Sequence, residues 1–120
     1  MSSNLPTEHQ EQVELVKWFQ GAYPEIKTRL FAIPNGTNKN VRQAAWYMAE
    51  GLRSGVPDMM LPIPKNGHHG LFIELKRQKG GVLSKTQKDW HEYLNAAGYL
   101  AVVCYGAEEA KTAINSYLEK

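Results

Sequence analysis

The chain has 120 residues, of which 42% are hydrophobic and 22% charged, and a formal net charge of +2. This size and composition predict one folded domain over residues 1–120 with its own core, and they exclude a disordered chain. The single Cys104 excludes an internal disulfide, and no apolar run approaches the roughly 20 residues of a membrane span. We therefore expect no membrane contact and a place in the cytoplasm of a bacterial or phage-infected cell.

A first helix is predicted to begin after Thr7, which can cap it, with Gln10 three residues later as in a capping box. Apolar residues over positions 13–19 then form a broad helical stripe. At about 100° per residue, Glu8 projects toward the middle of that stripe and Glu11 points further away. Both could equally be solvent-facing acids near a helix N-terminus, where the helix dipole favours them.

Residues 28–33 are predicted to form a strand, and residues 41–52 a second helix. The loop between them contains Asn35, which Pro-Asn-Gly turn chemistry explains without any function. Gly51 and Gly55 follow the second helix and allow a sharp turn into the next segment.

Residues 55–76 hold the chemically most informative pattern of the chain. Two apolar runs, 59–63 and 71–75, flank a segment rich in Pro, Asn and Gly, which predicts a β-hairpin. Asp58 directly precedes the first run and Glu74 lies inside the second, where a carboxylate is costly to bury unless it is paired or binds a cation. Lys76 shares the strand face of Glu74. Two acids and one ammonium at one point suit a metal ion and a phosphate.

The remaining elements are a third helix capped by Ser84, a nearly continuous apolar strand over residues 99–105 and a last helix over 108–118. Gln87 and His91 lie one turn apart on the third helix. The resulting order of elements predicts an α/β fold, in which a mixed sheet with a central β-hairpin is flanked by helices on both faces.

Positive charge is concentrated near the two acids. Residues 65–88 contain six basic residues and one acid, so this segment carries +5 and the remainder of the chain −3. Beside Asp58 and Glu74, such charge indicates a polyanion guided to a metal site. A solvated surface strip is the alternative.

Pro57-Asp58, fifteen further residues and then Glu74-Leu75-Lys76 together resemble the PD-(D/E)xK signature of metal-dependent nucleases. The wider order, with Pro34-Asn35-Gly36, residues 51–58 and Gln87, resembles the VRR-NUC branch of that superfamily over nearly the whole chain. The resemblance implies a restriction-endonuclease-like fold.

The resemblance also implies a metal site. Asp58 and Glu74 would hold Mg²⁺ or Mn²⁺ together with the main-chain carbonyl of Leu75, all of them hard oxygen ligands. An acid of the first helix would join them; the helical face favours Glu8, with Glu11 as the alternative.

Lys76 would orient the attacking water, and Gln87 would hold that water or Lys76 in place. His91 occupies a position often held by tyrosine in the family, so its role is left open. The residues expected to contact DNA are Lys65, Arg77, Lys79, Lys85, Lys88 and Asn35.

For the substrate, the resemblance implies branched DNA of repair and recombination, in particular the four-way Holliday junction, cut by a homodimer. A flap or single-stranded DNA nuclease and a non-catalytic DNA-binding module are the alternatives. A zinc protein is disfavoured because its candidate ligands lack paired close spacing; these are His9, His68, His69, His91 and Cys104.

Overall fold

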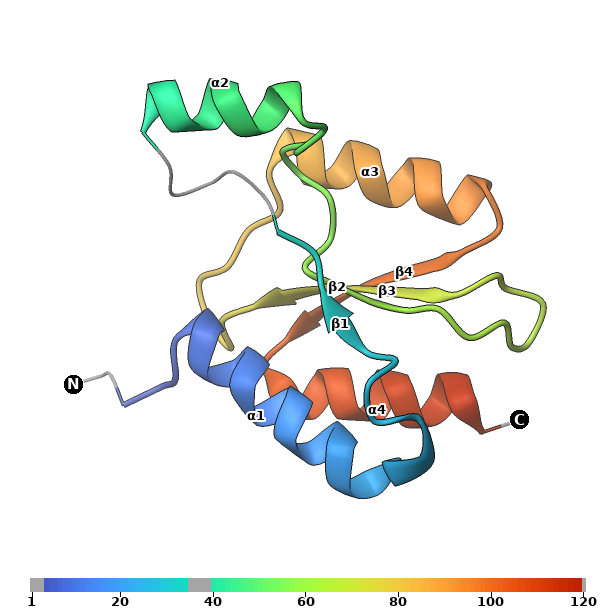
Figure 1. Ribbon diagram of the computed structural model, residues 1–120. Coiled ribbons are helices and arrows are strands. Elements are labelled where there is room, and N and C mark those ends of the chain that lie inside the picture. The colour runs from blue at the N-terminus through green and yellow to red at the C-terminus, as the bar shows by residue number, and fades with distance from the viewer. Residues whose placement is uncertain (1–3, 35–39, 120) are drawn as a thin grey trace.

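The computed structural model describes residues 4–34 and 40–119, which form an α/β fold (Figure 1). The elements follow in the order α1 (Glu8–Ala22), the 3-10 helix η1 (Pro24–Ile26), β1 (Phe31–Ala32), α2 (Val41–Ala49), β2 (Met59–Leu61), β3 (Leu71–Lys76), α3 (Lys85–Ala96), β4 (Leu100–Tyr105) and α4 (Ala107–Leu118). Apart from the short η1, this is the predicted order. Within the described ranges, no helix is both long enough and apolar enough to cross a membrane.

The strands form one mixed sheet in the order β1-β2-β3-β4. β2 pairs antiparallel with β1 and β3, and β3 pairs parallel with β4. The β2–β3 hairpin is therefore central, as predicted, and α3 is the crossover that a parallel β3–β4 pair requires. β3 is buried along its whole length, which places everything on it in a water-poor environment.

Helices cover both faces of the sheet, which confirms the predicted architecture. α1 and α4 lie on one face, whereas α3 lies on the other, with α2 beyond it on that side (Figure 1). Because side chains alternate along a strand, β3 divides its residues between the two faces. On the side of α1 and α4, the core contains Leu71, Ile73 and Leu75 of β3. They belong to the same cluster as Leu15 and Phe19 of α1 and Ala110 and Ile114 of α4. Phe72 packs with Leu94 and Ala101 on the α3 face, which Glu74 and Lys76 share by the same alternation.

Two helices begin with capping boxes; the sequence predicted the first box and, for α3, only the capping residue Ser84. In α1 the Thr7 hydroxyl accepts a hydrogen bond from the Gln10 N–H, and the Gln10 side chain accepts one from the Thr7 N–H. Ser84 and Gln87 make the same reciprocal pair at α3. Each box satisfies two main-chain donors that the helix itself leaves unpaired.

Three predicted elements differ from the structure by two or more residues at an end. The strand expected over residues 28–33 is only Phe31–Ala32, because η1 and a turn closed by the Arg29 N–H and the Ile26 carbonyl use the preceding residues. β2 also offers only three residues for pairing. The second helix ends at Ala49 instead of residue 52, since Gly51 turns the chain with φ of +105°.

Cys104 is a core residue, as expected. It is buried in the cluster on the α1–α4 side of the sheet. Burial raises the pKa of its thiol to about 11, with a smaller contribution from the negative charge of Glu109. A thiol in this environment is unreactive at neutral pH.

Glu11 joins three parts of the fold through a buried carboxylate. Its Oε1 accepts a hydrogen bond from the Ala107 N–H at 2.9 Å, and its Oε2 accepts one from Gln78 Nε2 at 2.8 Å. The N-cap of α4 is Gly106, which has no side chain to cap the helix. Glu11 therefore acts as the N-terminal acceptor of α4 from another helix, where a negative charge also suits the helix dipole.

We expect Glu11→Ala to lower the free energy of unfolding by about 2–3 kcal/mol, because it removes two hydrogen bonds to a charged group and leaves the Ala107 N–H buried and unpaired. Urea denaturation followed by circular dichroism measures the change. Glu8→Ala, at an exposed position in the first turn of the same helix, should cost less than about 1 kcal/mol. Equal losses in the two variants would contradict this role of Glu11.

Candidate active site

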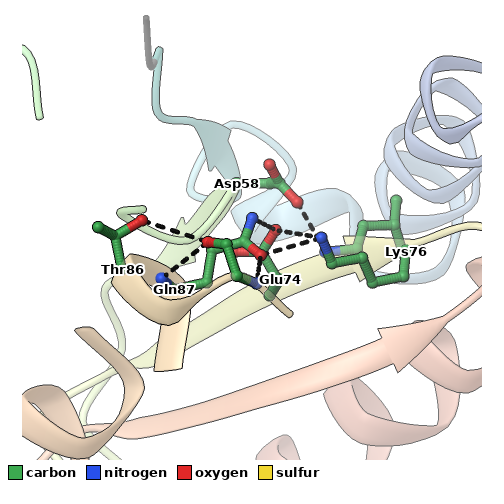
Figure 2. Close-up of polar contacts among 7 residues, drawn as sticks. Asp58, Glu74, Lys76, Thr86 and Gln87 are labelled. Atoms are coloured by element: carbon green, nitrogen blue, oxygen red, sulfur yellow. Dashed lines mark hydrogen bonds and ion pairs between the residues drawn. The ribbon is translucent and has the colours of Figure 1, made fainter. Parts of the chain in front are cut away.

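The hairpin brings Asp58 and Glu74 together. Met59 of β2 lies opposite Ile73 of β3. In an antiparallel pair the residue before Met59, Asp58, therefore lies opposite the residue after Ile73, Glu74, and their side chains fall on the same face of the sheet. Asp58 Oδ2 accepts a hydrogen bond from the Leu75 N–H at 2.7 Å. The Asp58 carboxylate thus continues the β2–β3 pairing by one step beyond the end of β2, and this bond fixes it beside Glu74 (Figure 2).

Lys76 completes a compact group of charges. Its ammonium lies 4.0 Å from Glu74 Oε2 and donates a hydrogen bond to Gln87 Oε1 at 3.0 Å. The side chain is buried, and the backbone at Gly81 passes close to it: a Cβ added there would lie 2.9 Å from Lys76 Cβ. Because residue 81 has no side chain, the backbone can pass directly over the aliphatic part of Lys76. This close packing restricts the positions that the ammonium can take.

Gln87 connects the start of α3 to both charged groups. Its Oε1 accepts hydrogen bonds from the Ser84 N–H and from Lys76 Nζ, at 2.9 and 3.0 Å. Its Nε2 donates to Glu74 Oε2 at 3.0 Å (Figure 2). One side chain therefore completes the capping box and orients the glutamate and the lysine. The sequence predicted that Gln87 would hold the attacking water or Lys76, but not its part in the capping box or its bond to Glu74.

The environment of Glu74 is unfavourable for a charge. Burial, the largest cause, and the negative charge of Asp58 raise the pKa of its carboxyl to about 8. The charge of Glu8 adds to this rise, and Lys76 opposes it. In the part of the chain that the structure describes, Glu74 Oε1 is buried without a hydrogen-bond partner. A buried carboxylate pair with an unpaired oxygen can be stabilised by a cation.

The oxygen atoms at this point fit a hard divalent cation. The N–H and C=O of one strand residue point to the same edge, so the Leu75 carbonyl faces the side on which its N–H meets Asp58. The Lys76 carbonyl points the opposite way, to Gly106. The available donors are thus Asp58, Glu74 and the Leu75 carbonyl, an all-oxygen set suited to Mg²⁺ or Mn²⁺.

A zinc centre is not supported. Among the described residues, no three His, Cys, Asp or Glu side chains gather closely enough to hold a metal ion. His9, His68, His69, His91 and Cys104 all lie in the described ranges, so the histidine–cysteine alternative lacks a site. The carboxylate pair is the side-chain part of the candidate metal site.

The two candidate acids of the first helix have different environments, and the helical-face argument about them is wrong. Glu11 is buried because it lies on the same face of α1 as Leu15 and Phe19, which come four and eight residues later. The apolar stripe in the sequence was too broad to show where the centre of this buried face lies. Both Glu11 oxygens are used by the fold. Glu8 is exposed, and its charge contributes to the raised pKa of Glu74, so it lies within electrostatic reach of the site.

The basic residues expected to contact DNA are divided between two places. Arg77, Lys79, Lys85 and Lys88 are exposed on the segment that runs from the end of β3 into α3, next to the site. Lys65 is not part of this group, because it lies in the β2–β3 loop at the opposite end of β3 (Figure 1). The expectation for Asn35 falls outside the described residues.

His91 is the buried polar residue whose role the sequence left open. It is 8% exposed, and its Nε2 has no hydrogen-bond partner within the described ranges. The only signal in the sequence was its spacing of one helical turn from Gln87.

The chain is similar to known proteins in both sequence and fold. A family model described as VRR-NUC domain matches residues 6–108, a range that includes all the site residues above. A solved structure described as a VRR_NUC domain protein superposes with a TM-score of 0.85 and 25% sequence identity, over 97% of this chain and 91% of that one. No curated protein matches the chain.

The raised pKa of Glu74 predicts how stability depends on pH without metal. A carboxyl whose pKa rises from 4.5 to about 8 on folding binds more protons in the folded state. The free energy of unfolding should therefore fall as the pH rises between these values. Each pKa unit corresponds to about 1.4 kcal/mol, so Glu74→Gln should raise stability at pH 8 by at least about 1 kcal/mol and flatten the profile. Thermal melts in EDTA between pH 5 and 8 measure both effects.

Glu25→Gln is the matched control, because Glu25 is an exposed acid on η1. It should leave the pH profile unchanged. A Glu74→Gln profile as steep as that of the unaltered protein would show that Glu74 is not the titrating group.

Proposed function

The chain belongs to the VRR-NUC domain family, a family of nucleases, and we propose that it is a Mg²⁺- or Mn²⁺-dependent endonuclease that hydrolyses phosphodiester bonds in branched DNA, above all in four-way junctions. The observation that carries this proposal is the Asp58–Glu74 pair beside the ammonium of Lys76, in which the buried Glu74 has one oxygen without a hydrogen-bond partner among the described residues. Acids in this position destabilise a metal-free protein, which is understandable if they serve a cation and an anionic substrate.

Each side chain has a distinct part in the reaction. Asp58, Glu74 and the Leu75 carbonyl would hold the ion. Among the described residues no third acid gathers with Asp58 and Glu74, so the exposed Glu8 would have to move toward them to complete the ligand set or to bind a second ion. The ion would neutralise the phosphate charge and lower the pKa of the attacking water. Asp58 is fixed for this task by its bond to the Leu75 N–H. Glu74 is oriented by Gln87 and must lose its proton as the site is filled.

Lys76 supplies a fixed positive charge. Because it is buried and bonded to Gln87, its ammonium needs no reorganisation when negative charge develops on the phosphorus centre. Such preorganised charge is worth more in a site that excludes water than in solution. Lys76 also lies close enough to Glu74 to orient the attacking water on that side.

The surroundings of the site suit a DNA backbone. The exposed basic residues Arg77, Lys79, Lys85 and Lys88 flank the end of β3 and the start of α3, where phosphates on either side of the cut would lie. In the described part of the fold, the helices are not arranged as a helix-turn-helix or another base-reading motif. Recognition by DNA shape and backbone contacts follows from this arrangement.

The exposed apolar side chains of α2 support a homodimer. The nine residues of α2 are all described and none is buried, while Val41, Trp46 and Met48 are 88%, 63% and 49% exposed. A helix this short is marginal in water without a packed face. A second copy packed there would give α2 that face, and a twofold dimer would present two sites to two strands of a symmetric junction.

Binding without cleavage is the second candidate. It explains the basic residues but not the buried acids, because an Asp58–Glu74 pair repels phosphate unless it holds a cation. A flap or single-stranded DNA nuclease shares the same chemistry and differs only in the substrate.

Cleavage of a labelled four-way junction with Mn²⁺ tests the chemistry. Asp58→Asn and Glu74→Gln should abolish cleavage, and Lys76→Ala should lower kcat by about 100-fold or more, since it removes a preorganised charge. Lys27→Ala, a distant exposed lysine, is the control. Cleavage retained in Glu74→Gln would remove Glu74 from the site. Binding of every branched DNA without cleavage by the unaltered protein would favour the binding module, and faster cutting of flaps or single strands would replace the junction as substrate.

Salt dependence tests the approach path of DNA. Lys79→Ala and Lys85→Ala should each weaken junction binding and reduce the slope of log K against log salt by up to about 0.9, the value for one phosphate contact. Fluorescence anisotropy from 50 to 300 mM salt measures the slope. Lys27→Ala should leave it unchanged; identical slopes in all three variants would argue against this path.

A further inference from the structure

His91 lies on α3 one turn beyond Gln87 and faces into the protein. Burial lowers the pKa of its imidazole, an effect partly offset by a hydrogen bond to the main chain of Ala101 and by the charge of Asp58, while Lys76 lowers it further. The ring is therefore neutral at pH 7, and it lies within electrostatic reach of both site residues.

The two ring nitrogens have different surroundings. Nε2 is buried and has no partner among the described residues, whereas the main chain of Ala101 lies near enough to the ring to favour its protonated form. A neutral imidazole that donates from Nδ1 carries a lone pair on Nε2. A buried acceptor without a donor destabilises the protein by about 1–3 kcal/mol, and residues 4–34 and 40–119 provide no donor for this nitrogen.

A purely structural role does not explain the histidine. Asn95 already joins α3 to β4: its Oδ1 accepts a hydrogen bond from the Ala101 N–H at 3.0 Å, and its Nδ2 donates to the carbonyls of His91 and Ala101. The anchor to β4 is thus present without the imidazole. A position that required only packing would be filled by an apolar ring at no desolvation cost.

Two buried polar side-chain atoms lack partners in the described part of the chain: His91 Nε2 and Glu74 Oε1. Both belong to the layer between β3 and α3. With a cation in the site Glu74 is a carboxylate, so both atoms are then hydrogen-bond acceptors and neither can satisfy the other directly. Water, which carries two protons, can donate one to each.

We propose that His91 is a positioning residue of the active site, whose Nε2 accepts a hydrogen bond from ordered water that in turn holds Glu74 Oε1. Together with Gln87, which holds Oε2, this water fixes the Glu74 carboxylate at both oxygens. The proposal rests on the proposed function, because a fixed carboxylate matters for holding a cation. His91 would thus orient a metal ligand without binding the metal itself, as residues that hydrogen-bond to the ligands do in other metal sites.

Matched substitutions separate the two nitrogens. The amide of His91→Gln reaches the position of Nε2, that of His91→Asn the position of Nδ1, and His91→Phe keeps the ring without either nitrogen. We expect His91→Gln to keep the Mn²⁺ affinity within about threefold, and His91→Asn and His91→Phe to lose about 10- to 100-fold. Isothermal titration calorimetry with MnCl₂ in the absence of DNA measures the affinity. With junction DNA, kcat should fall in the same order while KM stays nearly constant, since His91 does not touch the substrate.

Urea denaturation of the same variants checks the fold, and His91→Phe should be at least as stable as the unaltered protein. Unchanged Mn²⁺ affinity and kcat in His91→Phe would overturn the role of His91 alone. Loss in His91→Gln with retention in His91→Asn would assign the effect to the Ala101 anchor and also overturn it. Asp58→Asn provides the reference: if the unaltered protein binds Mn²⁺ no better than Asp58→Asn and cuts no branched DNA, the metal-dependent function fails together with the proposal.

Discussion

The burial of the Glu74 carboxylate beside Asp58 is the constraint on which the site depends. Three contacts compensate for it in part: the Leu75 N–H on Asp58, the Gln87 amide on Glu74 and the nearby ammonium of Lys76. They leave Glu74 Oε1 without a hydrogen-bond partner in the described part of the chain, and the pKa of its carboxyl at about 8. The stability lost at this point is the physical reason why a cation would bind there, since it would neutralise charge that the fold cannot.

The fold concentrates structural and chemical tasks in the same few residues. Gln87 begins α3 as a capping residue and orients Glu74 and Lys76, so the position of the helix and the geometry of the site cannot vary independently. Gly55 contributes to the same arrangement: it is buried with φ of +90°, and a Cβ there would lie 2.7 Å from the main chain of Thr86. The loop that leads to Asp58 is thereby packed against the first turn of α3.

Local sequence patterns predicted much of this structure, and the failures have identifiable causes. The capping residues Thr7 and Ser84 marked the helix starts correctly because capping acts over three residues. The strand expected over residues 28–33 was too long because strand length depends on the partner, and β2 is short. Lys65 is close in sequence to the other basic residues, but it lies in the loop between β2 and β3, where the hairpin reverses the chain, at the end of β3 away from those residues.

The sequence by itself determined the order of the elements, the hairpin and the convergence of Asp58, Glu74 and Lys76, because period-two alternation and the register of a hairpin are local properties. Only the tertiary structure decided which glutamate of α1 is buried and which is exposed. It buried Glu11 against the N-terminus of α4, a contact between residues 96 positions apart. It also placed His91 against the layer that contains Glu74. Burial of this kind is set by how helices pack on the sheet, which no local pattern specifies.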